Sequence, residues 1–312
     1  MEEMKETKSA SSTHDSFTSA PLDEKHDHHP AFSKDEFLSP DFTSEHISLI
    51  VREGIILGAG AEAILLQVAN PGVGAGVNEH SNFAYRVQDR LRTTMTFVYC
   101  MAFGTPQEKK TIVDMITAVH KNVNGTLNEG RDKGKAYNAL DPGLQLWVAA
   151  TLYASGLSVY ERVFGKIKNE ELNEKIYREY SILACALQVP PEMWPRTRRD
   201  FWAYWDHEIA TIEVTQHAKD VASDLLYLRK APWHLRMFTP AVRLVTAEWL
   251  PERIRAEYGV KRHPTRYKML EFLVKATYPA LPLSVRSYPV KLYMNDMRKR
   301  LANKRGVIGK NA

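Results

Sequence analysis

The chain has 312 residues, of which 44% are hydrophobic and 10% aromatic, enough for a large core and too many for a disordered or fibrous protein. Lys and Arg outnumber Asp and Glu by 42 to 37, a net charge of +5, so no nucleic-acid partner is expected. The cysteines, Cys100 and Cys185, lie in apolar stretches and predict neither a disulfide framework nor a cysteine metal site. These features indicate an intracellular, cytoplasmic protein.

Residues 1–40 are rich in Ser, Thr, Lys, Glu and Asp and lack hydrophobic periodicity, which predicts a disordered polar tail. The opening MEEMKETKSASS has no apolar segment of the kind a secretory signal contains. The most apolar long stretch, residues 47–68, carries Arg52, Glu53 and Glu62, so no transmembrane segment is expected.

Residues 41–312 are predicted to form a single all-α domain, because their apolar positions recur at helical spacing and are interrupted by Pro and Gly. The first long helix is expected over residues 83–103 and ends at Gly104-Thr105-Pro106. Its predicted inward residues are Val87, Leu91, Thr94, Met95, Val98 and Met101.

Three later stretches continue the helical pattern. The segment containing MITAVH is expected to form a helix that ends near Gly125. Asp141-Pro142 is typical of a helix start, and it precedes an apolar row. That row consists of Leu144, Trp147, Val148, Thr151, Leu152 and Val159. After Pro195 the sequence FWAYWDHEIATIEVTQHAKDVASDLLYL predicts a long helical stretch, and further helices close the chain.

The basic C-terminal run MRKRLANKRG has two explanations. A solvated helix face is the commoner one, and peripheral contact with anionic lipid is the alternative.

Two other kinds of site are disfavoured. GAGAEA, residues 58–63, matches a dinucleotide-binding fingerprint, and Glu79 follows about twenty residues later. No second strand or βαβ alternation follows, so close helix packing explains the glycines better. The chain also lacks the Glu-x-x-His pairs of a di-iron bundle, and Glu213 and His217 are expected to pair on a helix surface.

His120 occupies the same helical row as Ile112 and Ile116, where aliphatic side chains point. A buried, hydrogen-bonded core histidine is the commoner explanation, and an axial haem ligand is the alternative. One helix earlier, Arg90 and Thr94 are four residues apart and border the apolar row. Either they serve a cofactor site or Arg90 forms a salt bridge, and physical reasoning alone leaves both open.

Four motifs in order resemble one family over residues 53–226: AILLQVANPGVGAGVNEHSNF, DRLRTTMTFVYCMAFG, VHKNVNG and YNALDPGLQLWVAATL. The family is that of rubber oxygenase (latex-clearing protein) and the mycophenolic-acid-pathway oxygenase. The resemblance implies an all-α fold, a b-type haem, and the use of dioxygen on isoprenoid or other lipophilic unsaturated molecules, with cleavage of carbon–carbon double bonds.

The resemblance also implies roles for single residues. His120, in its H-x-x-V-x-G setting, matches the axial haem ligand and so the metal ligand. Arg90 and Thr94 match the arginine and threonine of the R-L-x-x-T motif beside the haem, where they would bind cofactor and assist catalysis. Glu79 is the candidate catalytic base, with a solvated loop carboxylate as the alternative, and His80 and Ser81 match an H-S pair of unassigned role.

Two positions depart from the family pattern. Asn70 stands where a histidine usually precedes the proline, so any role of that histidine is absent or moved. Thr93 replaces the lysine that approaches the iron in some rubber oxygenases, so a distal lysine ligand is not expected.

Three functions follow from these expectations. The first is a haem b oxygenase that cleaves alkenes in secondary metabolism. The second is a haem oxidoreductase that hydroxylates or dehydrogenates. The third is a haem-free helical protein that holds a lipophilic ligand. The sequence does not separate the first two, because pocket shape decides between them.

Overall fold

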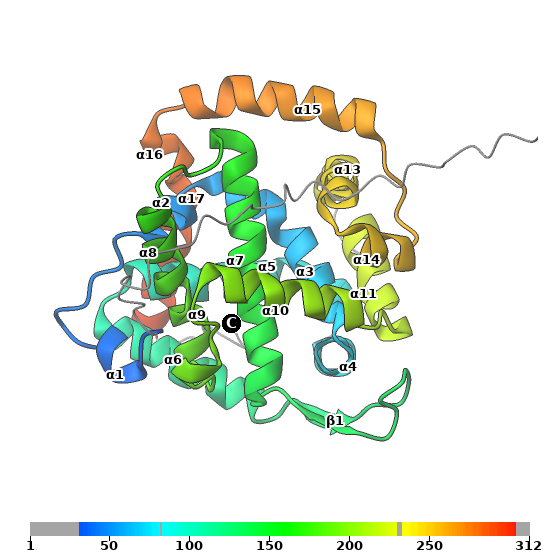
Figure 1. Ribbon diagram of the computed structural model, residues 1–312, viewed down its shortest axis with the longest axis horizontal. Coiled ribbons are helices and arrows are strands. Elements are labelled where there is room, and N and C mark those ends of the chain that lie inside the picture. The colour runs from blue at the N-terminus through cyan, green and yellow to red at the C-terminus, as the bar shows by residue number, and fades with distance from the viewer. Residues whose placement is uncertain (1–30, 82, 230–232, 304–312) are drawn as a thin grey trace, which may run out of the picture.

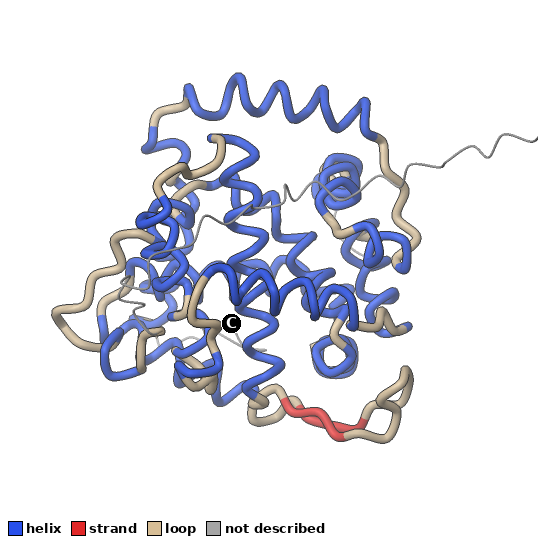
Figure 2. Tube along the Cα trace, viewed as in Figure 1, coloured by secondary structure: helices blue, strands red, loops and turns tan. Residues whose placement is uncertain are grey.

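The computed structural model describes residues 31–81, 83–229 and 233–303, and within this part of the chain helices form almost all of the regular structure (Figures 1 and 2). The expected all-α domain is confirmed. The α-helices of the first half are α1 (Lys34–Phe37), α2 (Ile47–Val51), α3 (Gly60–Ala69), α4 (Pro71–His80), α5 (Phe83–Phe103), α6 (Pro106–His120) and α7 (Pro142–Phe164). Those of the second half are α8 (Glu170–Tyr180), α9 (Ile182–Cys185), α10 (Arg198–Thr211), α11 (Gln216–Tyr227), α12 (Trp233–Arg236), α13 (Thr239–Trp249), α14 (Glu252–Glu257), α15 (Pro264–Thr277), α16 (Leu283–Arg286) and α17 (Tyr288–Ala302).

Shorter elements connect these helices. In the part of the chain that the structure describes, three 3-10 helices occur: η1 (Gly54–Ala59), η2 (Pro191–Met193) and η3 (Tyr278–Ala280). The strands β1 (Asn124–Thr126) and β2 (Ala136–Asn138) form an antiparallel hairpin between α6 and α7, in which Gly125 lies opposite Tyr137. This hairpin was not anticipated from the sequence.

The two longest helices, α5 and α7, run through the centre of the molecule and carry much of the core (Figure 1). Met95, Val98 and Met101 of α5 are buried as expected, and so are Trp147 and Val159 of α7. Helical periodicity was a reliable guide here because both helices bury one continuous apolar stripe.

The expected helix starts are also confirmed. The Asp141 carboxylate accepts hydrogen bonds from the amides of Gly143 and Leu144, and Pro142 occupies the first helical position of α7. Thr105 and Glu108 form a reciprocal capping box at the start of α6. These caps satisfy backbone donors that the helices themselves leave free.

The packed domain begins earlier in the chain than residue 41. Residues 34–37 form α1, capped by Ser33, and Phe37 is fully buried in the main core. Residues 1–30, the rest of the predicted tail, lie outside the described residues. The apolar residues of this segment are scattered among polar ones and show no helical period, which is why the sequence placed them in the tail.

The long helical stretch expected after Pro195 is divided into α10 and α11. Arg253 donates hydrogen bonds to the carbonyls of Ile209 and Ile212, which ends α10, and the amide of Val214 donates to Glu257. The residues that cause this break therefore lie on α14, about forty positions away in sequence.

The glycines of GAGAEA lie in a helical setting. Gly58 belongs to η1 and Gly60 begins α3, so helical structure stands where a dinucleotide-binding fingerprint requires a strand. The close-packing explanation is not met either, because a Cβ at Gly58 or Gly60 would lie 3.9 Å or 3.6 Å from its nearest neighbour. Among the described residues, each helix taken singly falls short of the length and apolar content that crossing a bilayer requires. The segments 54–69 and 71–80 meet that requirement only jointly, and the chain turns by 107° between them.

Candidate functional site

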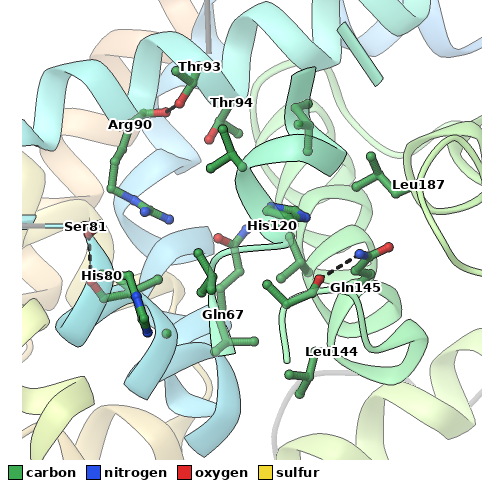
Figure 3. A pocket seen from close by; sticks show the side chains of 18 of the residues that line it. Gln67, His80, Ser81, Arg90, Thr93, Thr94, His120, Leu144, Gln145 and Leu187 are labelled. Atoms are coloured by element: carbon green, nitrogen blue, oxygen red, sulfur yellow. Dashed lines mark hydrogen bonds between the residues drawn. The ribbon is translucent and has the colours of Figure 1, made fainter. Parts of the chain in front are cut away.

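A cavity of about 670 Å³ lies between α4, α5, α6, α7 and the β hairpin (Figure 3). Its size falls in the range typical of small-molecule and cofactor sites. Most of its wall is aliphatic or aromatic: Val73, Val77, Phe97, Ile116, Val119, Val123, Leu144, Val148, Leu152, Leu183 and Leu187. The polar residues that line it include Gln67, His80, Arg90, Thr93, Thr94 and His120.

The α4 wall begins at Asn70, whose side-chain oxygen accepts hydrogen bonds from the amides of Gly72 and Val73. This cap starts a helix that is rich in glycine. A Cβ at Gly74 would lie 2.6 Å from the carbonyl oxygen of Val68. The small residues therefore let α4 pack tightly against the end of α3 and form one side of the cavity.

The α5 wall presents Arg90, Thr93, Thr94 and Phe97, which share one face of the helix. The hydroxyl of Thr93 donates to the carbonyl of Arg90 at 3.0 Å. Burial lowers the pKa of Arg90 to about 10, so the guanidinium remains charged at neutral pH although the fold disfavours that charge. Arg90 and Thr94 both line the cavity, so their predicted inward placement is confirmed.

His120 is the last residue of α6, and its ring lines the cavity. In Figure 3 Arg90 and His80 lie on one side, His120 and Gln145 on the other, and Gln67 between them. Burial, followed by the positive charge of Arg90, lowers the pKa of His120 to about 4. Its imidazole is therefore neutral at physiological pH, as a metal ligand must be. Nδ1 is buried and has no hydrogen-bond partner among the described residues, so the expectation of a hydrogen-bonded core histidine is not met.

The residues after His120 have a structural explanation. Val123 lines the cavity, and Gly125 lies on β1 beneath the ring of Tyr137. A Cβ at Gly125 would lie 2.8 Å from the Tyr137 hydroxyl oxygen and 2.9 Å from its ring carbons. The H-x-x-V-x-G pattern thus sets both a cavity wall and the close approach of an aromatic residue from β2.

Tyr137 joins two residues that the sequence had singled out. Its hydroxyl donates to Oε2 of Glu79 at 2.6 Å, and Nε2 of His80 lies 3.1 Å from the same hydroxyl. Tyr137 and His80 line the cavity, whereas Glu79 is not among the described residues that do. Burial, together with the adjacent Glu79 carboxylate, raises the pKa of Tyr137, so the hydroxyl keeps its proton.

The network continues away from the cavity. Nε2 of His217 lies 4.0 Å from Oε1 of Glu79, and its Nδ1 lies 3.4 Å from Glu129. Glu213 instead pairs with Arg131 at 3.3 Å. The expected pairing of Glu213 with His217 is therefore wrong, because Glu213 lies in the break between α10 and α11.

A row of glutamines on the α7 side was missed by sequence reasoning. Gln145 donates to the carbonyl of Ala139 at 2.7 Å and to Gln188 at 2.6 Å, and Gln188 donates to Thr117 at 3.1 Å. This row ties the hairpin to α6 and α7 on the His120 side of the cavity. The only sign of this row in the sequence was Gln145, a single polar residue within the apolar start of α7.

Within the described residues, no group of three or more His, Cys, Asp or Glu side chains is arranged to hold a bare metal ion. A porphyrin supplies four nitrogen ligands of its own and needs one axial protein ligand. The neutral ring of His120, with its unpartnered Nδ1 and apolar surroundings, fits that requirement.

Comparison with known proteins finds a matching family profile. The profile of the family described as "ER-bound oxygenase mpaB/B'/Rubber oxygenase, catalytic domain" matches residues 48–278. This chain belongs to that family. The resemblance noted from the motifs is therefore confirmed, and the all-α oxygenase-type domain contains every residue of the cavity.

Two uncharacterized proteins, from Mycobacterium tuberculosis and Mycobacterium bovis, are each 30% identical to the chain over 260 residues. Each alignment covers 80% of this chain and 98% of the relative. No solved structure matches the chain significantly.

The two departures from the oxygenase family pattern have clear structural settings. Asn70 caps α4, a role that a histidine side chain fills less well. Thr93 lines the cavity with a short side chain whose hydroxyl is bound to its own helix. In this member of the family a short hydroxyl side chain thus lines the cavity next to Arg90.

Proposed function

We propose that the chain is a haem b-dependent oxygenase in which His120 is the axial ligand. The observation that carries this proposal is the neutral, half-buried imidazole of His120 facing a 670 Å³ cavity across from Arg90. Membership of an oxygenase family supports it. When bound, the haem would supply the redox chemistry on dioxygen.

The chain's own residues would bind and orient the reactants. Arg90 is a cation within the cavity wall, suited to a propionate or to a developing negative charge. Thr94 adds a hydroxyl on the same helix face. The Tyr137 hydroxyl donates its hydrogen bond to Glu79 and lies between that carboxylate and the cavity. A proton that moves from the substrate to Glu79 would thus pass through the Tyr137 hydroxyl. Glu79 would therefore serve as a base only through Tyr137.

The substrate class follows from the wall of the cavity. Because most lining residues are aliphatic or aromatic, the site favours a lipophilic molecule and excludes water. We propose an isoprenoid or other unsaturated substrate that is cleaved at a double bond, with both atoms of dioxygen entering the two carbonyl products. Hydroxylation would add one oxygen atom, and dehydrogenation would remove two hydrogens, so product masses distinguish the three reactions.

The first test is an absorption spectrum of protein expressed with a haem precursor, followed by a pyridine haemochrome assay. We expect a Soret band and about one b-type haem per chain. The variant His120→Ala should lose the haem and keep its helical circular dichroism. The matched control is His207→Ala, because His207 is exposed on α10.

Two results would contradict the proposal. A well-folded, haem-supplied protein without a Soret band would favour a haem-free ligand-binding protein. Retention of haem by His120→Ala would reassign the ligand, and His80→Ala would then be the next variant, because His80 also lines the cavity.

A further inference from the structure

Helix α15 carries an apolar stripe on its outward face. Met269, Phe272 and Leu273 are 70%, 75% and 57% exposed, and their spacing places them on one side of the helix. Tyr267, on the opposite side, is buried. A helix with its polar residues outward is the usual surface pattern, so this arrangement is inverted.

The stripe belongs to a helix that is firmly attached to the body. The hydroxyl of Tyr267 accepts a 2.7 Å hydrogen bond from Nε1 of Trp249. Beyond α15, Arg286 pairs with the buried Glu53 at 2.7 Å, and Tyr278 also bonds to Glu53. Figure 1 shows α15 along the upper edge of the molecule, with the other helices below it.

The apolar exposure extends past the end of α15. The turn, α16 and the start of α17 expose further large side chains: Leu281, Leu283, Val285, Tyr288 and Leu292. With the α15 stripe, they make an accumulation of exposed apolar residues that is typical of an interaction surface.

Positive charge surrounds this surface. Residues 261–300 contain ten Lys or Arg and two Asp or Glu, whereas the whole chain contains 42 and 37. At about 100° per residue, Arg266 flanks the stripe on one side and Lys268 and Lys275 flank it on the other. Five of the ten cations pair with carboxylates: Arg262, Lys275, Arg286, Arg298 and Arg300. Arg266 and Lys268, which flank the stripe, are exposed.

We propose that the outward face of α15, with the exposed residues of 281–292, binds the surface of an anionic phospholipid bilayer. An apolar stripe bordered by Lys and Arg is the pattern of a helix that lies in the membrane interface, where the cations meet headgroups and the apolar side chains enter the acyl boundary. Long basic side chains reach the headgroups while their stems cover apolar surface.

A second copy of the chain is a poorer occupant. A twofold interface would bring the same cation-bordered surface against itself, and like charges at an interface are repulsive. Lysine is also depleted at protein–protein interfaces. The charge of the surface therefore favours lipid over self-association.

The test is binding of the full chain to vesicles, measured by flotation. Vesicles of phosphatidylglycerol and phosphatidylcholine should bind the chain, vesicles of phosphatidylcholine alone should bind it much more weakly, and about 1 M salt should reduce the binding.

Arg266→Gln with Lys268→Gln should weaken binding by roughly fivefold for each cation removed. Phe272→Ser should weaken it by about tenfold. Lys133→Gln with Lys135→Gln, at the exposed hairpin tip, is the matched control and should bind like wild type.

A fluorescent label gives a second readout that does not depend on affinity. The native Cys100 and Cys185 are buried, and burial raises the pKa of each to about 12, so a thiol-reactive dye will label Phe272→Cys selectively. The dye at position 272 should shift to the blue when anionic vesicles are added. The same dye on Lys133→Cys should not shift.

The outcomes separate lipid binding from its rivals. Equal binding of all variants, or no preference for anionic vesicles, overturns the proposal. A blue shift that grows with protein concentration in the absence of vesicles, together with a dimer in size-exclusion light scattering, identifies a second copy as the occupant and also overturns it. None of these measurements requires haem, so failure here leaves the proposed enzymatic function untouched.

Discussion

The hydroxyl of Tyr137 donates a 2.6 Å hydrogen bond to the carboxylate of Glu79. Tyr137 comes from the hairpin and Glu79 from α4, so this contact joins two walls of the cavity. It also places a retained phenolic proton between the carboxylate and the cavity. We therefore expect Tyr137 and Glu79 to be energetically coupled, which a double-mutant cycle can test.

Tyr137→Phe and Glu79→Gln should each lower the free energy of unfolding by about 1 kcal/mol, since each removes the same partly exposed hydrogen bond. The double variant should cost little more than either single one. Urea denaturation measures all three, with Tyr288→Phe as the exposed control. Strictly additive losses would show that the two groups are independent.

Arg90→Gln should change the free energy of unfolding by less than about 1 kcal/mol, because the cost of burying the guanidinium, which lowers its pKa, offsets what its contacts contribute. Once a substrate has been identified, the activity of Arg90→Gln should be at least about tenfold lower than that of the wild type. Arg286→Gln is the contrasting variant, since it removes the nearer of the two arginines that pair with the buried Glu53 and leaves the other, Arg52, at 3.8 Å; it should cost about 3 kcal/mol. A comparable loss in Arg90→Gln would favour the salt-bridge explanation of Arg90.

Gly125→Ala should destabilise the hairpin by about 1–3 kcal/mol, because the new methyl group would collide with a tyrosine ring that Glu79 and His80 hold in place. Thermal unfolding followed by circular dichroism measures the effect. Gly58→Ala is the control, since the nearest atom to its Cβ would be 3.9 Å away. A stable Gly125→Ala protein would mean that Tyr137 moves easily.

Glu62 makes stability depend on pH. Burial raises its pKa from 4.5 to about 7, against the opposing effect of Arg162. Between pH 4.5 and 7 the folded chain keeps a proton that the unfolded chain releases, so the free energy of unfolding falls as pH rises through this window. Glu62→Gln removes this dependence and should be more stable than wild type at pH 8 by up to about 3 kcal/mol.

Urea titrations at pH 5 and pH 8 test this expectation. The exposed Glu252→Gln on α14 is the control and should follow the wild-type pH dependence. Parallel curves for wild type and Glu62→Gln would show that Glu62 does not titrate in this window.

The sequence predicted the long helices and their inward faces well, because α5 and α7 each bury one stripe over six turns or so. Arg90, Thr94 and His120 were placed inward for the same reason. Tyr137 was missed because strands of three residues contain too few positions to show an alternating pattern.

The break between α10 and α11 was missed for a different reason. The side chains of Arg253 and Glu257 cap residues 209–214 from another helix, and no local pattern encodes a contact across such a separation. The break falls in residues 211–215, four of which are β-branched and favour a helix less than the residues before them, and the contacts from α14 complete it.

The hairpin between α6 and α7 contributes Val123, Tyr137 and Ala139 to the cavity, while its tip at residues 128–134 does not line it. The tip is bonded instead to the break between α10 and α11, since Glu129 accepts a hydrogen bond from the amide of His217 and Arg131 donates one to the carbonyl of Thr211. Changes in its length should therefore disturb that break rather than the cavity wall. Exchanges at Ala139 would instead change the room available to a ligand without touching any long helix. Ala139 is thus a position at which evolution, or an engineer, can retune selectivity at little risk to the scaffold.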